Sequence, residues 1–298
     1  MEQDTESSWS LRIKSLFLPG LAMILSLILT SLVIASNPSV YAFVFPNEVA
    51  LIEGLIVILI IGVVGGVATL ITFFVFRRGG ELLNRVIIAV FVSPVFFLLT
   101  IFIGQAILLL LFFQGMTNLH ISLIAMASIF FSAMSLVLIF TDALSPTFRN
   151  VVFTIYGLIL GVFIGCNLSW YASLALLIVL AAEDTLFATK LGETIVEADP
   201  RQHARSAFAF MIGPIMIGIG DLVVYAALTA YSLRFFGWNI AYITMGAILV
   251  GCFINGYLIV RQPNRVIPGL PIPLICALVP ILISLSQITL MGMGLGLI

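Results

Sequence analysis

The sequence predicts an all-α polytopic membrane protein with nine transmembrane helices in a single membrane domain, residues 1–298. Of its 298 residues, 62% are hydrophobic and only 8% are charged, whereas a soluble domain carries about a quarter charged residues. So few charges cannot coat a large soluble domain, and they exclude a disordered chain or a nucleic-acid-binding protein with a basic surface. Long apolar runs favour helices over a β-barrel, whose strands would alternate in short segments.

Each expected helix is an apolar run of about 20 residues, the length needed to cross a bilayer. The first run is too long for the apolar part of a signal peptide, and acidic residues precede it, so we expect a retained signal anchor. Spans one to six occupy about 15–189 and spans seven to nine about 207–297. The nine runs are 15–35, 50–76, 86–113, 119–141, 150–167, 169–189, 207–233, 238–260 and 271–297.

The basic residues predict the orientation of these helices. With nine spans, the N-terminal segment and the loops after spans two, four, six and eight lie on one side. Cytoplasmic segments are enriched in Lys and Arg, so we expect a cytoplasmic N-terminus and a C-terminus outside. Only Arg234 falls on the other side; the rest are Arg12, Lys14, Arg77, Arg78, Arg85, Arg149, Lys190, Arg201, Arg205, Arg261 and Arg265.

Small residues predict where helices pack closely. Gly157, Gly161 and Gly165 recur every four residues, so they share one face of span five and favour close contact with a neighbouring helix. Span two has a similar group, Gly62, Gly65 and Gly66.

The sequence indicates no cofactor and no metal site. The three cysteines lie in apolar runs without paired spacing, which is typical of buried reduced thiols. The two histidines are isolated and are expected on opposite sides of the membrane. Polar residues within spans, Asn255 among them, are expected to make interhelical or interfacial hydrogen bonds. The residues concerned are Cys166, Cys252, Cys276, His120 and His203.

Ionisable residues deep in a span are candidates for function, because each costs about 2.5–3.5 kcal/mol on insertion scales. Ten of the 13 acids lie in the N-terminal segment, in loops or near the ends of spans. Three remain inside the predicted membrane, namely Glu183, Asp184 and Asp221.

Two of these acids can lie at one depth. Asp184 is six residues before Lys190, which marks the predicted cytoplasmic interface, so it lies about 9 Å inside. Asp221 would lie about 24 Å deep if a continuous helix began at Arg205. The depths agree if the helix begins at Pro214, because proline is favoured at the first helical position and Asp221 is then about 10 Å along. The stretch 206–213 would have to be extended, and a continuous helix there would refute this hypothesis.

Two carboxylates at one depth on neighbouring antiparallel helices point to acid–base chemistry. When such groups are close they cannot both ionise, so they share one proton. The ionised carboxylate can take a proton from water while the protonated one polarises a carbonyl, as in aspartic proteases. Gly218 and Gly220 would let backbone or substrate approach Asp221 closely. A protonated pair that only joins two helices, or a proton relay in a transporter, remain open alternatives.

Two motifs around these acids resemble those of a known family. Gly218-Ile219-Gly220-Asp221 resembles the Gly-x-Gly-Asp motif in span seven of presenilin-type intramembrane aspartyl proteases, within the presenilin and signal peptide peptidase superfamily. Asp184, with Lys190 six residues on, is similar to the span-six aspartate of that family. The predicted topology matches the presenilin arrangement, whereas signal peptide peptidases are expected to be inverted. Both motifs lie at the expected places in the chain.

A third motif resembles the family less closely. Its Pro-Ala-Leu, at the start of span nine, appears here as Leu270-Pro271-Ile272-Pro273-Leu274. Glu183 stands where the family usually has Tyr before the span-six aspartate. The resemblance covers the whole chain in topology, but it is residue-specific only around 183–190, 218–225 and 269–278.

The resemblance implies an enzyme and the residues that would carry its activity. Asp184 and Asp221 would be catalytic, and residues 270–274 would contact the substrate. That substrate would be a single-span membrane protein that enters from the lipid bilayer and is locally unwound. An extended 206–213 would offer it a strand edge, and the carbonyls of 268–273, which is not expected to be regular helix, would contact it. Supporting residues would be Gly218, Gly220, Glu183, Tyr225 and Lys190.

Three other readings of the chain remain. A proton-coupled transporter would use Glu183, Asp184 and Asp221 as a relay, although the internal repeats common in transporters are not evident. A prepilin-peptidase-like enzyme would use a similar glycine–aspartate site, but the motif here lies in span seven and no cysteine-bearing cytoplasmic loop is present. A purely structural subunit would leave two matched buried acids unexplained.

Overall fold

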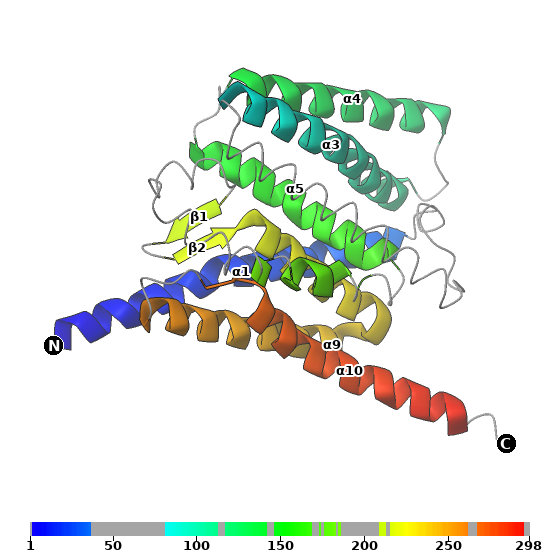
Figure 1. Ribbon diagram of the computed structural model, residues 1–298. Helices are drawn as coiled ribbons and strands as arrows, with labels where there is room; N and C mark the ends of the chain where they lie inside the picture. Colours follow the sequence, from blue (N-terminus) through cyan, green and yellow to red (C-terminus); the bar gives the residue numbers. More distant parts are fainter. Residues whose placement is uncertain are drawn as a thin grey trace.

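The computed structural model describes residues 2–36, 81–112, 117–141, 146–168, 173, 176–182, 184–185, 209–212, 215–261 and 267–294. The described chain is nearly all helical, with one two-stranded sheet. The helices are α1 (Glu2–Ser36), α3 (Glu81–Leu111), α4 (Asn118–Thr141), α5 (Pro146–Asn167), α9 (Ile219–Arg261) and α10 (Pro271–Gly294). Figure 1 shows them as one elongated bundle.

Most of the expected spans coincide with a helix of the structure. The helices α1, α3, α4, α5 and α9 are each long and apolar enough to cross a membrane, and α10 contains a shorter apolar helix. Span six is described only in part and is helical over 176–182. Span two, with its three glycines, lies outside the described residues. The structure therefore confirms that the described chain is nearly all helical and has helices that could cross a membrane.

Spans seven and eight form the longest helix, α9, which has a kink near its middle. Gly237 interrupts it with φ 80° and ψ −175°. A positive φ of this size is readily adopted by glycine and strained for other residues. The kink falls between the expected spans, which end at 233 and begin at 238. Two predicted helices are thus joined through one glycine.

The start of span seven is a β-hairpin rather than a helix. Strand β1 (Ala209–Ile212) pairs antiparallel with β2 (Ile215–Gly218), in the register Ala209–Gly218 to Ile212–Ile215. The expected extended stretch is confirmed over 209–212. The expected helix start at Pro214 is wrong, because the helix begins five residues later, at Ile219. Residues 215–218, which that helix would have included, instead pair with 209–212 as a strand.

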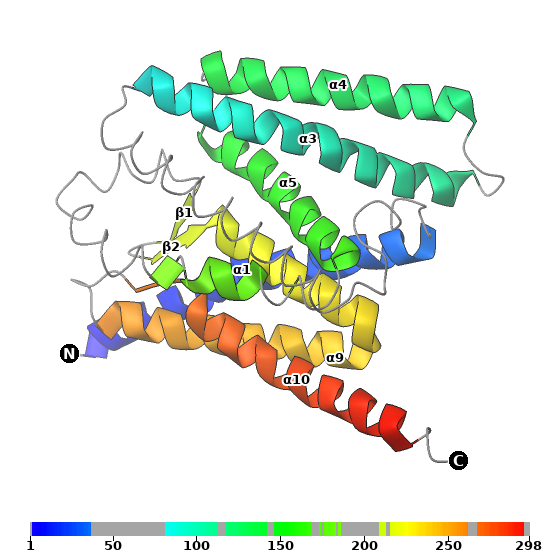
Figure 2. The same ribbon diagram turned by 45° about the vertical axis from the view of Figure 1, so that its right-hand side comes forward.

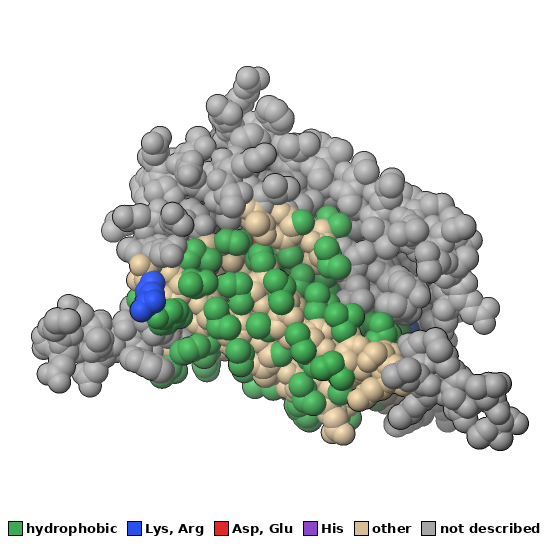
Figure 3. Space-filling model, turned by 60° about the horizontal axis from the view of Figure 1, so that its bottom comes forward, with side chains coloured by type: hydrophobic (Ala, Val, Ile, Leu, Met, Phe, Trp, Pro, Cys, Tyr) green, Lys and Arg blue, Asp and Glu red, His purple; other side chains and the backbone are tan. Residues whose placement is uncertain are grey.

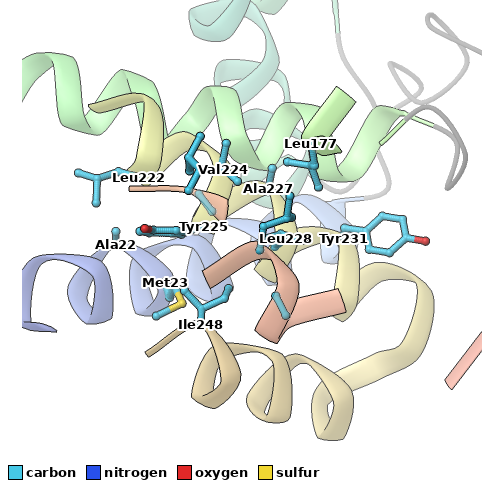
Figure 4. Packing of buried hydrophobic residues seen from close by; sticks show 14 of the residues in the cluster. Ala22, Met23, Leu177, Leu222, Val224, Tyr225, Ala227, Leu228, Tyr231 and Ile248 are labelled. Carbon is cyan, nitrogen blue, oxygen red and sulfur yellow. The ribbon is translucent and has the colours of Figure 1, made fainter. Parts of the chain in front are cut away.

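The helix α9 lies at the centre of the bundle. It packs against α5, α1 and α10, while α3 packs mainly on α4. Figures 1 and 2 show α3 and α4 side by side on one flank, with α5 between them and α9 and with α10 crossing α9 on the other flank. The core at this centre joins Met23 of α1, Leu177, and Leu222, Leu228 and Ile248 of α9 (Figure 4).

The glycine face of α5 packs directly on α9, as predicted. A Cβ atom at Gly161 would lie 2.5 Å from the carbonyl oxygen of Val223, and one at Gly165 would lie 2.5 Å from that of Ala227. Such distances leave no room for any side chain, so the two helix backbones are in contact. On the opposite side of α9, Gly251 lies against the backbone of Pro273 in α10.

The outer surface of the described helices is hydrophobic. Figure 3 shows one face on which hydrophobic side chains predominate where it is described, with a basic side chain at one edge. Exposed large hydrophobic residues also cover α4, which packs mainly on α3. Such a surface would aggregate in water and is suited to lipid. On α9 and α10 the exposed residues include Ile243, Val250, Ile275, Val279 and Leu282.

Candidate active site

Asp221 is fixed by the start of α9, directly after the hairpin. It is the third residue of the helix, and its Oδ2 accepts a hydrogen bond of 3.2 Å from the N–H of Gly218. Gly218 precedes the first helical residue, so this bond is the return half of a capping box, in which the third residue caps the residue before the helix. The Gly-x-Gly-Asp sequence therefore ends the strand, starts the helix and orients the carboxylate together.

Asp184 is fixed from the other side, by the segment before α10. Its Oδ2 accepts a hydrogen bond of 2.9 Å from the N–H of Leu270, and the amide of Gly269 also acts on this carboxylate. Leu270 immediately precedes the first residue of α10. Amides at the start of a helix have no partner within the helix, so a carboxylate is a favourable acceptor for them.

Asp184 and Asp221 converge on the same two residues. A Cβ atom at Gly269 would lie 2.7 Å from Oδ2 and 3.3 Å from Oδ1 of Asp221, so the Gly269 backbone is packed against that carboxylate. The next residue, Leu270, binds Asp184. The two carboxylates also interact electrostatically with each other. The structure therefore brings together the two aspartates that the sequence singled out.

The surroundings of the two aspartates are apolar. Both carboxyl-bearing residues are half-buried. The buried side chains of Ile217, Leu222 and Leu270 belong to the adjoining core. In such a medium charges interact more strongly than in water, and backbone amides stabilise a carboxylate at no cost of reorganisation.

A groove runs beside Asp184. It has a volume of about 220 Å³, opens to the surface and lies between the helix that carries Asp184 and α10. Its walls are almost entirely apolar, so it suits a hydrophobic helix or side chains rather than a polar solute. The lining residues are Ile178, Ala181, Ala182, Thr185, Pro271, Leu274, Ile275 and Leu278.

Tyr225 lies near both aspartates and forms a hydrogen bond with the Gly269 segment. The sequence left open whether it bonds to the two acids or only packs. Its hydroxyl donates a hydrogen bond of 3.3 Å to the carbonyl oxygen of Gly269, and it also contacts the thiol of Cys252.

The span-nine motif differs from the expectation in its secondary structure. Residues 267–270 are non-helical, but the expectation that 268–273 avoids regular helix is wrong for 271–273, which form the first turn of α10. Prolines fit there because the first turn needs no N–H donors. Pro271 and Leu274 line the groove, whereas Pro273 is buried against Gly251 of α9. Ile272 is half-buried.

The four remaining residues predicted to support the site differ in how far the structure describes them. Gly218 contributes its N–H to Asp221, as described above. A Cβ atom at Gly220 would meet open space, its chain neighbours aside, and a backbone segment does approach Asp221 closely, at Gly269. Glu183 and Lys190 lie outside the described residues.

Sequence reasoning missed two residues of this site. Gly269 touches Asp221, and Asn255 binds the Gly269 carbonyl from α9. No local pattern marks Gly269, since its role depends on a carboxylate 48 residues away in the chain. A polar residue in an apolar span marked Asn255, but only as a partner in some interhelical bond.

Within the described part of the chain, no group of three or more His, Cys, Asp or Glu side chains could hold a metal ion. Cys166, Cys252 and Cys276 are free thiols. No protein-family model matches this chain, and no curated protein matches it either.

Proposed function

We propose that this protein is a presenilin-type intramembrane aspartyl protease. Asp184 and Asp221 would hydrolyse peptide bonds within the transmembrane helices of single-span membrane proteins, with water as the nucleophile. The observation that carries the proposal is the convergence of both carboxylates on Gly269 and Leu270 inside an apolar helical bundle. Buried acids are expensive, and two that meet at one backbone segment are hard to explain by packing alone.

The proposal includes nine spans, a cytoplasmic N-terminus and a C-terminus outside. The distribution of Lys and Arg supports it, and so does the second half of α9. Trp238 and Tyr242 are exposed near its start with their rings tilted toward each other, and Arg261 lies over the ring of Tyr257 at its end. These ends are 23 residues apart, about 35 Å in a helix, which matches a membrane with aromatic and basic anchors.

In the reaction, two carboxyls that share one proton would act as general base and general acid. The ionised carboxylate removes a proton from water, whose oxygen attacks the scissile carbonyl carbon. The protonated carboxyl hydrogen-bonds to the carbonyl oxygen and stabilises its developing charge. The tetrahedral intermediate then collapses, the C–N bond breaks, and a proton passes from a carboxyl to the departing nitrogen. The two aspartates exchange protonation states during the cycle.

The groove and the hairpin would give the substrate its path. An apolar substrate segment fits the groove between the Asp184 helix and α10, whose walls are apolar. Peptide bonds in a helix are shielded by their hydrogen bonds, so the segment must unwind before attack. The hairpin β1–β2 leads directly into Asp221 and has strand edges with which unwound backbone can pair.

The test is cleavage of a labelled single-span protein in liposomes. Asp184→Ala and Asp221→Ala are each expected to reduce the rate about 1,000-fold or more, because the two carboxyls act as a unit. Asp199→Ala, in a predicted loop, is the matched control and is expected to cleave normally. Both aspartate variants should elute from gel filtration like the parent. Cleavage retained by either one would contradict the proposal.

The alternative of a proton-coupled transporter uses the same acids. It predicts proton uptake into liposomes that depends on Asp184 and Asp221, without cleavage of any single-span protein. Measuring internal pH in the same liposomes decides between the two.

A further inference from the structure

Asn255 connects α9 to the backbone that precedes α10. Its Nδ2 donates a hydrogen bond of 2.6 Å to the carbonyl oxygen of Gly269 and one of 3.3 Å to that of Pro268. An amide NH2 group has two hydrogens, so both donors are used. Only 6% of the Asn255 residue is exposed.

The Gly269 carbonyl belongs to the same peptide group as the Leu270 N–H. That group is planar and trans, so its oxygen and its hydrogen point in opposite directions. Asn255 and Tyr225 hold the oxygen, while the hydrogen is donated to Asp184. Fixing the oxygen therefore fixes the direction of the N–H, and hydrogen bonds in such a chain polarise one another.

The same peptide group also borders the second aspartate. The Cα of Gly269 is packed against the Asp221 carboxylate. One peptide plane thus borders both acids. In a reaction that needs a common water, a shift of about 1 Å can lower the rate about 100-fold.

We propose that Asn255 is a positioning residue of the active site, which sets the relative placement of Asp184 and Asp221 through the Gly269–Leu270 peptide. The inference rests on the proposed protease function. Asn255 does not line the groove, and its side-chain amide donates to backbone carbonyls, so it acts through the backbone.

Packing alone does not account for an asparagine at this position. Its Oδ1 is buried without a hydrogen-bond partner, a cost that an aliphatic side chain of similar size would avoid. The contact between α9 and α10 is already made one turn earlier, by Gly251 against Pro273. What the amide adds is its pair of bonds to the two carbonyls.

The test compares Asn255→Leu with the parent on a single-span substrate in liposomes. Leucine keeps the approximate volume and removes both donors. Three quantities are measured: kcat, KM, and the inhibition constant of a peptide hydroxyethylene isostere, whose hydroxyl binds between the two carboxyls. We expect kcat and the affinity for the isostere each to fall about 10-fold or more, with KM within about twofold of the parent.

Thr244→Val is the matched control. Thr244 is buried in the same helix, 11 residues from Asn255, and its hydroxyl accepts a hydrogen bond from Ser232. Thr244→Val removes this hydrogen bond and so tests the effect of losing a buried hydrogen bond elsewhere in α9. We expect its KM and its affinity for the isostere to equal those of the parent. Tyr225→Phe removes the second donor to the Gly269 carbonyl. Because both residues act on the same peptide, the fall in kcat of the double variant should differ from the product of the two single falls.

The outcomes separate the inference from the function on which it rests. A parent enzyme that cleaves, with an Asn255→Leu variant that keeps parental isostere affinity, overturns the positioning role and leaves the protease proposal standing. If kcat falls but the inhibition constant of the isostere is unchanged, the variant only has less folded enzyme, and the positioning role is overturned as well. A parent that neither cleaves nor binds the isostere removes the protease proposal and the inference together.

Discussion

At the scale of single residues, Gly269 is the position where backbone lies closest against the Asp221 carboxylate among the glycines of the described chain. Gly269→Ala would place a methyl group 2.7 Å from Oδ2 of Asp221. The carboxylate or the segment before α10 must then move. We expect about 100-fold lower proteolysis with a normal gel-filtration profile, because residue 269 lies outside the helices.

Gly246→Ala is the control for this substitution. Gly246 is exposed on α9 and has open space around it, so a methyl group meets nothing. If both Gly246→Ala and Gly269→Ala keep the activity of the parent, the contact of Gly269 with Asp221 has no catalytic consequence.

The paired carboxyls predict a bell-shaped pH dependence of kcat/KM. At low pH both are protonated and no base is left for the water. At high pH both are ionised and the carbonyl loses its proton donor. Initial rates in liposomes buffered on both sides from acid to alkaline pH measure the profile, and a rate that rises to a plateau would count against a shared proton.

At the scale of elements, the close contact between α5 and α9 is expected to contribute to stability. Gly161→Ala and Gly165→Ala would each force a methyl group to within 2.8 Å of Ala226 or Ala230 respectively, with a carbonyl oxygen also in the way. Overpacking of this kind costs about 1–3 kcal/mol. We expect a lower Tm in detergent for both variants.

Gly20→Ala tests whether that loss is specific. Gly20 of α1 also faces α9, but an added methyl would lie 3.9 Å from Leu249, an ordinary contact. A fall in Tm for Gly20→Ala as large as for Gly161→Ala would show that close α5–α9 packing is not the cause.

At the scale of the whole molecule, the proposed topology places the segment near residue 202 inside and the start of α4 outside. Gln202→Cys and Asn118→Cys, each in a chain whose three native cysteines are replaced, can be labelled with a membrane-impermeant maleimide. In intact cells only Asn118→Cys should react, and Gln202→Cys should react after permeabilisation. The reverse pattern would overturn the cytoplasmic N-terminus.

Composition and periodicity were enough to predict the helical elements, because a membrane-spanning helix is a local property of about 20 residues. They also identified Asp184 and Asp221, since a buried acid stands out in an apolar run. The hairpin start of span seven was only half predicted, because residues 215–218 pair with 209–212 as a strand where proline's preference for helix starts favoured a helix. Gly269 and Asn255 were out of reach, because their roles arise from contacts between segments distant in the chain.

The central claim is that Asp184 and Asp221 together hydrolyse a peptide bond inside the membrane. The most direct measurement is mass spectrometry of the products from a single-span substrate incubated with the parent enzyme in ¹⁸O-labelled water. The account predicts a cut within the apolar span, with one ¹⁸O in the new C-terminal carboxyl, and no such product from Asp184→Ala or Asp221→Ala. Absence of a cut in the span, or the same labelled product from either variant, would contradict it.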